Sequence, residues 1–241
     1  MKLEELQKDI KYIASEYRGA SQVVVMRMTF SFMVNYSYLV CDNKTHRSVI
    51  VDPAWDMEKI DMVLASTRTK LRGVLLTHSH PDHIHLAEPL AKKYDCPIWM
   101  SYEEIGYSGF KAQRLIGVEM IPWEVGQMQI QPILTPGHTP GSTCYLIGNN
   151  LFTGDTLFAE GCGICPDVQA ARAMFTSLNL LKSRIKPETN VFPGHSYGKP
   201  PGQKFSHLLK DNMYLQFRNE SDFAVFRLRR GQKHSAFANF F

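Results

Sequence analysis

The stretch Thr77-His78-Ser79-His80-Pro81-Asp82-His83 follows the apolar run Gly73-Val74-Leu75-Leu76 and is the most informative part of this chain. It holds three histidines and one aspartate within six residues, donors that suit Zn²⁺, with Fe and Mn as second choices. His78 and His80 stand two residues apart, so both lie on one side of an extended segment. Asp82 and His83 follow across a turn that contains proline, where the chain can reverse and direct a second pair of ligands. One loop therefore offers two pairs, enough to begin two metal sites.

Two metals need further ligands, and three short loops offer one each. These are His138 in Thr135-Pro-Gly-His-Thr-Pro-Gly-Ser142, Asp155 in Phe152-Thr-Gly-Asp-Thr-Leu-Phe158 and His195 in Phe192-Pro-Gly-His-Ser-Tyr197. Each ligand follows a β-like apolar run and has glycine directly before it, so the backbone can turn sharply there. The pattern predicts that all three side chains point out of the end of a sheet.

The order HxHxDH, PGHT, TGDTLF and PGH resembles the metallo-β-lactamase superfamily, and within it the glyoxalase II-like hydrolases, over roughly residues 23–195. The resemblance implies an α/β fold, the four-layer αβ/βα sandwich. It also implies two Zn²⁺ per chain, although the same ligands accept Fe or Mn. The implied ligands are His78, His80 and His138 for one ion, Asp82, His83 and His195 for the other, and Asp155 as the bridge. Asp52, which ends a strand, would support the metal loop from outside the ligand set.

Asp82 and Asp155 are the candidate catalytic residues of such a site. A bridging carboxylate partly neutralises two dications, and two metals about 3.5–4 Å apart can lower the pKa of a shared water towards about 7. A departing thiol has a pKa of about 8.5 and needs little help from a general acid. This agrees with the absence of an obvious Ser-His-Asp or Cys-His apparatus. We therefore expect a metal-dependent hydrolase that cleaves an acyl thioester.

The subfamily motifs narrow the choice. The bridging ligand Asp155 argues against true β-lactamases. The TGDTLF motif and the GCG motif, Gly161-Cys162-Gly163, argue against Fe-dependent persulfide dioxygenases, the less favoured alternative. A binding protein that reuses the fold is a third class. No nucleic-acid module is recognisable. The residues that hold glutathione in glyoxalase II are mostly missing, because the GCG loop continues as the apolar Ile164-Cys165-Pro166. Tyr197 matches a family tyrosine that contacts the substrate carrier, or is simply a tyrosine at the rim.

The distribution of charge along the chain suggests which molecule carries the acyl group of the substrate. Residues 182–241 contain eleven Lys and Arg against four acids, whereas the whole chain carries a net charge of +4. A basic region can steer an acidic partner, although a solvated face is the other interpretation. The last 40 or so residues loosely resemble the PksB-type hydrolases found with polyketide synthases. The favoured function is removal of acyl groups from acyl carrier protein in polyketide, hence antibiotic, biosynthesis. The alternative is glyoxalase II-like hydrolysis of glutathione or CoA thioesters.

Composition sets the remaining limits. No apolar segment reaches the length that spans a membrane, and no signal peptide is evident, so we expect a cytoplasmic protein. The spacing of Leu3, Leu6, Ile10, Ile13 and Tyr17 predicts an amphipathic helix over residues 1–20, ahead of a single domain over 21–241. The oligomeric state stays open.

The cysteines and the other histidines fit ordinary structural roles. Cys41, Cys96 and Cys144 have the pattern of small buried hydrophobes, and the lone CxxC of Cys162 and Cys165 does not make a structural zinc site. Surface or core roles are expected for four histidines: His46, His85, His207 and His234.

The remaining expectation is a coarse order of elements. Strands are predicted near 22–29, 34–41, 48–51, 73–77, 97–100, 118–121, 129–134, 142–147, 150–153 and 190–193. Helices are predicted near 56–66, 85–94, 167–183 and 203–217.

Overall fold

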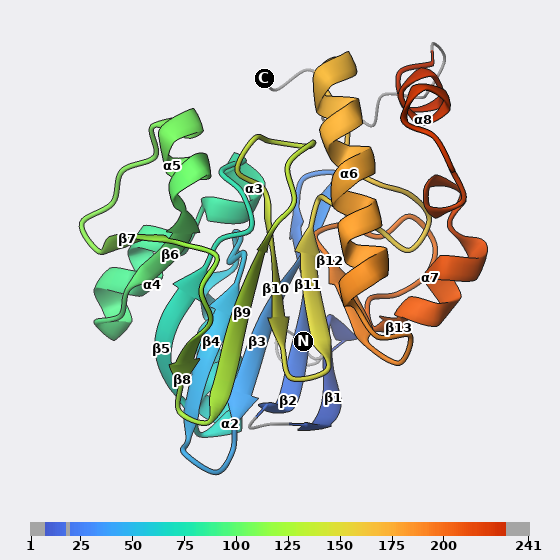
Figure 1. The fold of residues 1–241 in the computed structure, drawn as a ribbon. Helices are drawn as coiled ribbons and strands as arrows, with labels where there is room; N and C mark the ends of the chain where they lie inside the picture. The colour runs from blue at the N-terminus through green and yellow to red at the C-terminus, as the bar shows by residue number, and fades with distance from the viewer. Residues whose placement is uncertain (1–7, 18–19, 230–241) are drawn as a thin grey trace.

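Two β-sheets pack face to face between layers of helices in the computed structural model, which describes residues 8–17 and 20–229 (Figure 1). The first sheet has the order β1 (Ile10–Tyr17), β2 (Ala20–Phe30), β3 (Met33–Asp42), β4 (Arg47–Val51), β5 (Lys70–Leu75), β6 (Ile98–Ser101) and β7 (Leu115–Val118). The second has the order β13 (Gln203–Lys204), β12 (Asn190–Pro193), β11 (Asn150–Gly154), β10 (Thr143–Ile147), β9 (Met128–Leu134) and β8 (Trp123–Val125).

The helices divide between the two outer faces (Figure 1). Those beside the first sheet are α2 (Met57–Thr67), α3 (Pro81–Ile84), α4 (Ala87–Tyr94) and α5 (Tyr102–Ser108). Those beside the second are α6 (Val168–Arg184), α7 (Phe205–Asp211), the 3-10 helix η1 (Met213–Leu215) and α8 (Glu220–Arg227). The predicted four-layer αβ/βα sandwich is confirmed.

Strand β2 shows how the sequence builds this core. Successive side chains of a strand point to opposite faces of the sheet. Val23 and Val25 belong to the apolar cluster between the two sheets, whereas Val24 and Met26 belong to the cluster that includes residues of α2 and α4. A strand buried on both faces has a continuous apolar sequence, which explains the run Val23-Val-Val-Met26.

Strand direction places the functional loops at one edge. Strands β4, β5 and β6 run parallel to one another in the first sheet. Strands β11 and β12 are parallel, and β9 runs in the same direction because β10 is antiparallel to both β9 and β11. The carboxyl ends of neighbouring parallel strands meet at the same edge of a sheet. Every loop that carries a predicted ligand begins at such an end.

The helix predicted over residues 1–20 is wrong over residues 10–17. Residues 10–17 form strand β1, antiparallel to β2; residues 1–7 and 18–19 lie outside the described residues. Ile10 packs against the cluster on the helix side of the sheet, whereas Ile13 packs against the cluster between the sheets. A spacing of three puts side chains on one face of a helix but on opposite faces of a strand. Pairing with β2 therefore favours the strand.

Other boundaries also moved. The helix predicted over 203–217 is divided at Asn212, whose Nδ2 donates to the carbonyls of Phe158 and Gly161 at 3.0 Å. The strand predicted near 118–121 is the earlier β7. Strands β1, β8 and β13 and helices α5 and α8 were not predicted, because short or strongly polar elements carry a weak periodic signal.

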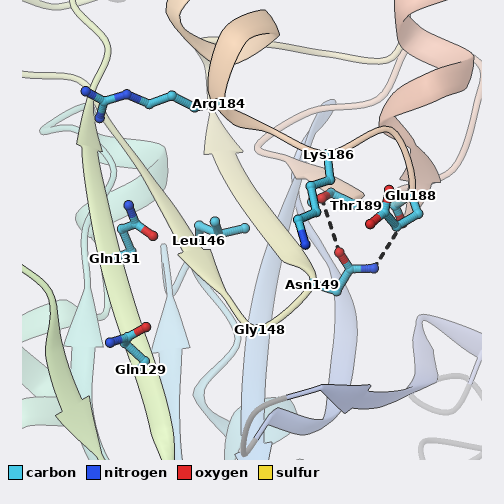
Figure 2. Close-up of a pocket in the computed structure, with 9 residues that line it drawn as sticks. All are labelled: Gln129, Gln131, Leu146, Gly148, Asn149, Arg184, Lys186, Glu188 and Thr189. Carbon is cyan, nitrogen blue, oxygen red and sulfur yellow. Dashed lines mark hydrogen bonds between the residues drawn. The ribbon is translucent and has the colours of Figure 1, made fainter.

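A polar groove lies on the outer face of the second sheet, at the opposite end of β11 and β12 from the ligand loops (Figure 2). Gln129 and Gln131 of β9 form one side. Asn149 forms the other through hydrogen bonds to the Glu188 carbonyl at 3.0 Å and from Thr189 Oγ1 at 3.2 Å. The groove contains none of the predicted ligands.

Two expectations about residue classes can be checked directly. All five cysteines are free and buried, which confirms the expectation for Cys41, Cys96 and Cys144. Among the described residues, no helix combines the length and apolar character needed to cross a bilayer.

Candidate metal centre

Seven predicted ligands converge at the edge where the carboxyl ends of the strands meet. The loop after β5 carries His78 and His80, and α3 carries Asp82 and His83. Helix α3 begins at Pro81, whose fixed φ angle suits the first helical position and produces the predicted turn. The other three ligands follow three strands of the second sheet: His138 after β9, Asp155 after β11 and His195 after β12.

Three histidine nitrogens form the first group. His80 Nδ1 lies 3.1 Å from His78 Nε2 and 2.9 Å from His138 Nε2. All three side chains could hold one metal ion. His78 is fully buried, and the other two are partly accessible, so this group lies beneath the surface with one open side.

A mixed group of Asp82, His83 and His195 lies beside the first and could hold another ion. Oδ2 of Asp82 is 3.6 Å from His83 Nε2 and 3.4 Å from His195 Nε2. Asp155 faces both groups. Its Oδ1 is 3.5 Å from His83 Nε2, and its Oδ2 is 3.6 Å from His138 Nε2 and 3.4 Å from His195 Nε2.

Asp52 organises this site from behind. Its Oδ1 accepts a hydrogen bond from Thr77 N at 2.8 Å, and its Oδ2 accepts from Thr77 Oγ1 at 2.6 Å. Oδ2 also lies 2.9 Å from His83 Nδ1. Because the Thr77 hydroxyl proton points to Asp52, Oγ1 accepts from His78 Nδ1 at 3.0 Å. Asp52 can also be grouped with His78 and His83 as a metal site, but its oxygens are already used by these donors.

Backbone carbonyls orient two more imidazoles. His138 Nδ1 lies 2.9 Å from the Ile164 carbonyl of the GCG loop, and His195 Nδ1 lies 2.9 Å from the Val34 carbonyl of β3. A protonated Nδ1 leaves Nε2 as the free donor of the lone pair. With His78 and His83 this makes four imidazoles whose Nδ1 is hydrogen-bonded and whose Nε2 points to the centre. Hydrogen-bond partners outside a metal site commonly orient ligand imidazoles in this way.

The histidines of the two groups differ in their pKa values. Burial lowers the pKa of His80 to about 4 and holds the pKa of His78 well below its ordinary value, with neighbouring imidazoles adding to the effect. Burial also acts on His83, but Asp82, Asp155 and Asp52 outweigh it and raise its pKa to about 9. The first group is therefore neutral and ready to coordinate. The mixed group holds protons that a metal must displace.

The donor set fits zinc. His83 Nε2 and Asp155 Oδ1 are buried and have no hydrogen-bond partner, which is costly unless another group satisfies them. Zinc bonds of about 2.0–2.2 Å in a tetrahedron put neighbouring ligand atoms about 3.3–3.6 Å apart. The spacings around Asp82 and Asp155, 3.4–3.6 Å, agree with this geometry. A cation between these atoms would satisfy both orphaned atoms.

Two polar residues beside the centre were not predicted. Asn35 of β3 donates to Asp82 through Nδ2, to the carbonyl at 2.8 Å and to Oδ2 at 2.9 Å. Glu104 of α5 is fully buried and contacts two ligand loops. The available signals were a lone amide in an apolar strand and a glutamate three residues after Ser101. Both have ordinary local explanations, in the second case a helix cap.

Tyr197 and the remaining histidines lie as follows. The Tyr197 ring is exposed and stacks edge-on against Phe158 at 5.3 Å between centroids, and Phe158 contacts His195. This puts Tyr197 at the rim of the centre. His46, His85 and His207 are exposed and belong to none of the ligand groups, as expected, and His234 lies outside the described residues.

Comparison with known proteins agrees with this geometry. Residues 31–195 match the model of the metallo-beta-lactamase superfamily, and the chain belongs to that superfamily. The probable polyketide biosynthesis zinc-dependent hydrolase BaeB of Bacillus velezensis is 45% identical over 201 residues, covering 83% of this chain and 89% of that protein. PksB of Bacillus subtilis, with the same description, is 41% identical over the same shares.

More distant similarities complete the comparison. A hydroxyacylglutathione hydrolase of Pelagibacter ubique is 32% identical and covers 68% of each chain. The crystal structure of ETHE1 from Myxococcus xanthus has a TM-score of 0.72 at 27% identity, covering 84% of this chain and 89% of that one. Family, relatives and donor set together make this chain a metal-dependent hydrolase.

Proposed function

We propose that this chain is a binuclear zinc thioester hydrolase that removes acyl groups from an acyl carrier protein during polyketide biosynthesis. The observation that carries the binuclear assignment is the position of Asp155, whose carboxylate lies 3.5 Å from His83 Nε2 of the mixed group and 3.6 Å from His138 Nε2 of the three-histidine group. His78, His80 and His138 would hold one ion, and Asp82, His83 and His195 the other, with Asp155 as the shared ligand. Asp52 would orient His83 from outside the ligand set.

The reaction makes few demands on other side chains. Bound zinc would act as a Lewis acid and would lower the pKa of coordinated water. Burial raises the pKa of Asp155, but the charges of His195 and His83 outweigh burial and hold it well below its usual range, so its carboxylate is ionised and available to both groups. Asp82 keeps its orientation through Asn35. A leaving thiol with a pKa of about 8.5 departs without a dedicated general acid.

Support for the polyketide setting comes from the relatives. BaeB and PksB are both described as probable polyketide biosynthesis hydrolases, and the chain covers most of their length. The proposed substrate in this setting is an acyl thioester of a carrier protein. Tyr197, exposed at the rim, would contact the arm that carries the acyl group.

The basic C-terminal region supports an acidic partner in part. Several of its cations have internal roles: Lys182 donates to the Leu215 carbonyl, Arg227 to the Gly163 carbonyl, and Lys199 pairs with Asp211. Lys210 and Arg218 are exposed and are the better candidates for steering a carrier protein.

Hydrolysis of acyl-phosphopantetheine carrier protein should be measured beside hydrolysis of S-lactoylglutathione and of a small acyl thioester. We expect the carrier substrate to give the highest kcat/KM. The double variant Lys210→Glu/Arg218→Glu should lower kcat/KM for the carrier but leave the small thioester unchanged. A strong preference for the glutathione ester would reject this proposal and favour the glyoxalase II-like function, which the 32% identical relative supports.

Metal content separates the remaining alternative. The proposal requires two zinc ions per purified chain. One iron per chain, with sulfite formed from a persulfide, would instead identify an iron-dependent dioxygenase.

A further inference from the structure

Glu104 is a fully buried acid in the first turn of α5. The sequence Ser101-Tyr-Glu-Glu104 has the form of a capping box, in which the glutamate would fold back on the start of its own helix. Ser101 caps the helix as this motif predicts, since its Oγ accepts from Glu104 N at 3.1 Å. The Glu104 carboxylate instead reaches two loops that carry candidate ligands.

Four donors fill this carboxylate. Oε1 accepts from Ser79 N at 2.8 Å and from Ser79 Oγ at 2.6 Å. Oε2 accepts from Thr139 Oγ1 at 2.7 Å and from Gly141 N at 3.1 Å. Hydrogen bonds to an ionised carboxylate are roughly twice as strong as neutral ones, and burial increases the penalty for losing them. The carboxylate therefore holds the two loops at a defined separation.

The residues that Glu104 contacts are next to only one ligand group. Ser79 stands between His78 and His80, and Thr139 directly follows His138. All three histidines of the first group thus come from the two segments that Glu104 joins.

The backbone around α5 reinforces this connection. Ser101 Oγ donates to the Gly141 carbonyl at 2.7 Å. A side chain at Gly141 would lie 2.0 Å from Glu104 N, so glycine is required for the loop to approach the helix this closely. The start of α5 and the 139–141 segment therefore form one rigid unit.

We propose that Glu104 is a positioning residue that sets the separation of the 78–80 and 138–141 segments and thereby determines metal affinity at the three-histidine position. This inference rests on the proposed binuclear site and adds to it a residue that contacts no metal. Loss of such an outer partner typically lowers metal affinity about 10- to 100-fold.

Glu104→Gln is the informative substitution. It keeps size and shape, but its NH₂ group must face the backbone N–H of either Ser79 or Gly141, neither of which can accept a hydrogen bond. The matched control is Glu103→Gln on the same helix, because Glu103 is exposed. Each substitution is combined with His195→Ala, which impairs the mixed group, and separately with His138→Ala, which impairs the three-histidine group.

Zinc affinity by chelator competition and the visible spectrum of the Co²⁺ form are measured for each protein, with thermal unfolding of the metal-free forms. With His195→Ala, Glu104→Gln should lower the remaining affinity about 10- to 100-fold. With His138→Ala it should change affinity less than threefold, and Glu103→Gln should change neither background. If Glu104→Gln does not fold, Ser79→Ala removes one of the four hydrogen bonds and should lower affinity severalfold in the His195→Ala background alone.

Equal affinity losses in both backgrounds would show a general structural role and overturn the proposal, as would unchanged affinity with His195→Ala. A wild-type protein with two zinc ions and an unaffected Glu104→Gln variant would reject only the role of Glu104. A wild-type protein that binds no metal would reject the proposed function and this inference together.

Discussion

Oδ2 of Asp52 lies 2.9 Å from Nδ1 of His83, and both side chains are buried. The same carboxylate holds Thr77, the residue before His78. One acid directly after β4 thus contacts the imidazole of one candidate ligand and the start of the loop that carries two others, His78 and His80. This relationship connects the two groups of the centre through a residue that need not contact a metal.

Asp52→Asn should weaken metal binding about 10- to 100-fold. The asparagine side chain has one oxygen, so it cannot replace both carboxylate oxygens that face Thr77 and His83. The loss should be largest for the more weakly held ion. Asp95→Asn is a suitable control, since Asp95 is exposed and its left-handed backbone suits asparagine. Zinc retained during dialysis against a chelator measures the effect. Equal retention by Asp52→Asn and the control would contradict the assigned role.

Asp155→Asn should reduce zinc from two ions per chain to one or fewer and should lower kcat about 100-fold or more. The substitution keeps the shape of the side chain but removes the charge that faces both groups. Zinc content by atomic spectroscopy and turnover of a small thioester are the measurements, with circular dichroism as the test of folding. Two tightly bound ions in this variant would rule out the bridging role.

Two glycine-to-alanine substitutions should have opposite effects. A Cβ at Gly163 would lie 1.9 Å from the Asp155 carbonyl oxygen, so the GCG loop that orients His138 must shift. We expect a stability loss of about 1–3 kcal/mol and loss of activity. A Cβ at Gly106 in α5 meets nothing within 4 Å, and alanine there should add about 0.5–1 kcal/mol. Urea unfolding of both variants checks these signs. A destabilised Gly106→Ala protein would be inconsistent with the helix described.

The stability of the fold should depend on pH through Asp42. Asp42 joins the turn after β3 to the β8–β9 hairpin by accepting from Lys44 N at 3.0 Å and Gln127 N at 2.8 Å. Burial raises its pKa, but hydrogen bonds, first of all from Thr45, outweigh burial and lower the pKa below its ordinary value. Since the folded pKa lies below the unfolded value of about 3.9, the stabilisation is complete above that pH. It disappears as the pH falls through the folded pKa.

Thermal unfolding of metal-free wild type and Asp42→Asn between pH 7 and pH 3 tests this sign. The wild type should be more stable by a constant margin above about pH 5, and the margin should narrow below about pH 4. A margin that widens in acid would show that the pKa of Asp42 is raised instead.

Tyr197→Ala should raise KM for the acyl carrier substrate severalfold with a smaller change in kcat. The ring is exposed at the rim and packs on Phe158, so it can contact substrate without touching the reacting atoms. Tyr197→Phe separates the ring from the hydroxyl and should behave as wild type if stacking is what matters. Unchanged kinetics in Tyr197→Ala would make this residue a surface tyrosine without a substrate role.

Much of the fold could be read from local patterns. The run Val23-Val-Val-Met26 predicts a strand buried on both faces, and the structure has one there. Residues 10–17 were misassigned because their spacing fits a helix as well as a strand, and only pairing with β2 distinguishes the two. The helix predicted over 203–217 failed for a similar reason, since Asn212 interrupts it by donating a hydrogen bond to Phe158, 54 residues away.

The sequence alone was enough to indicate which side chains meet at the centre, because every predicted ligand lies within eight residues after the end of a strand, and strands that run in one direction bring such segments to the same edge. It could not reveal the contacts that orient these ligands. Glu104 accepts a hydrogen bond from Ser79, which is 25 residues away in the sequence. Asn35 donates a hydrogen bond to Asp82, which is 47 residues away. Only the packing of the two sheets and α5 brings those partners within hydrogen-bond distance. The tertiary structure therefore decided how rigidly the ligands are held.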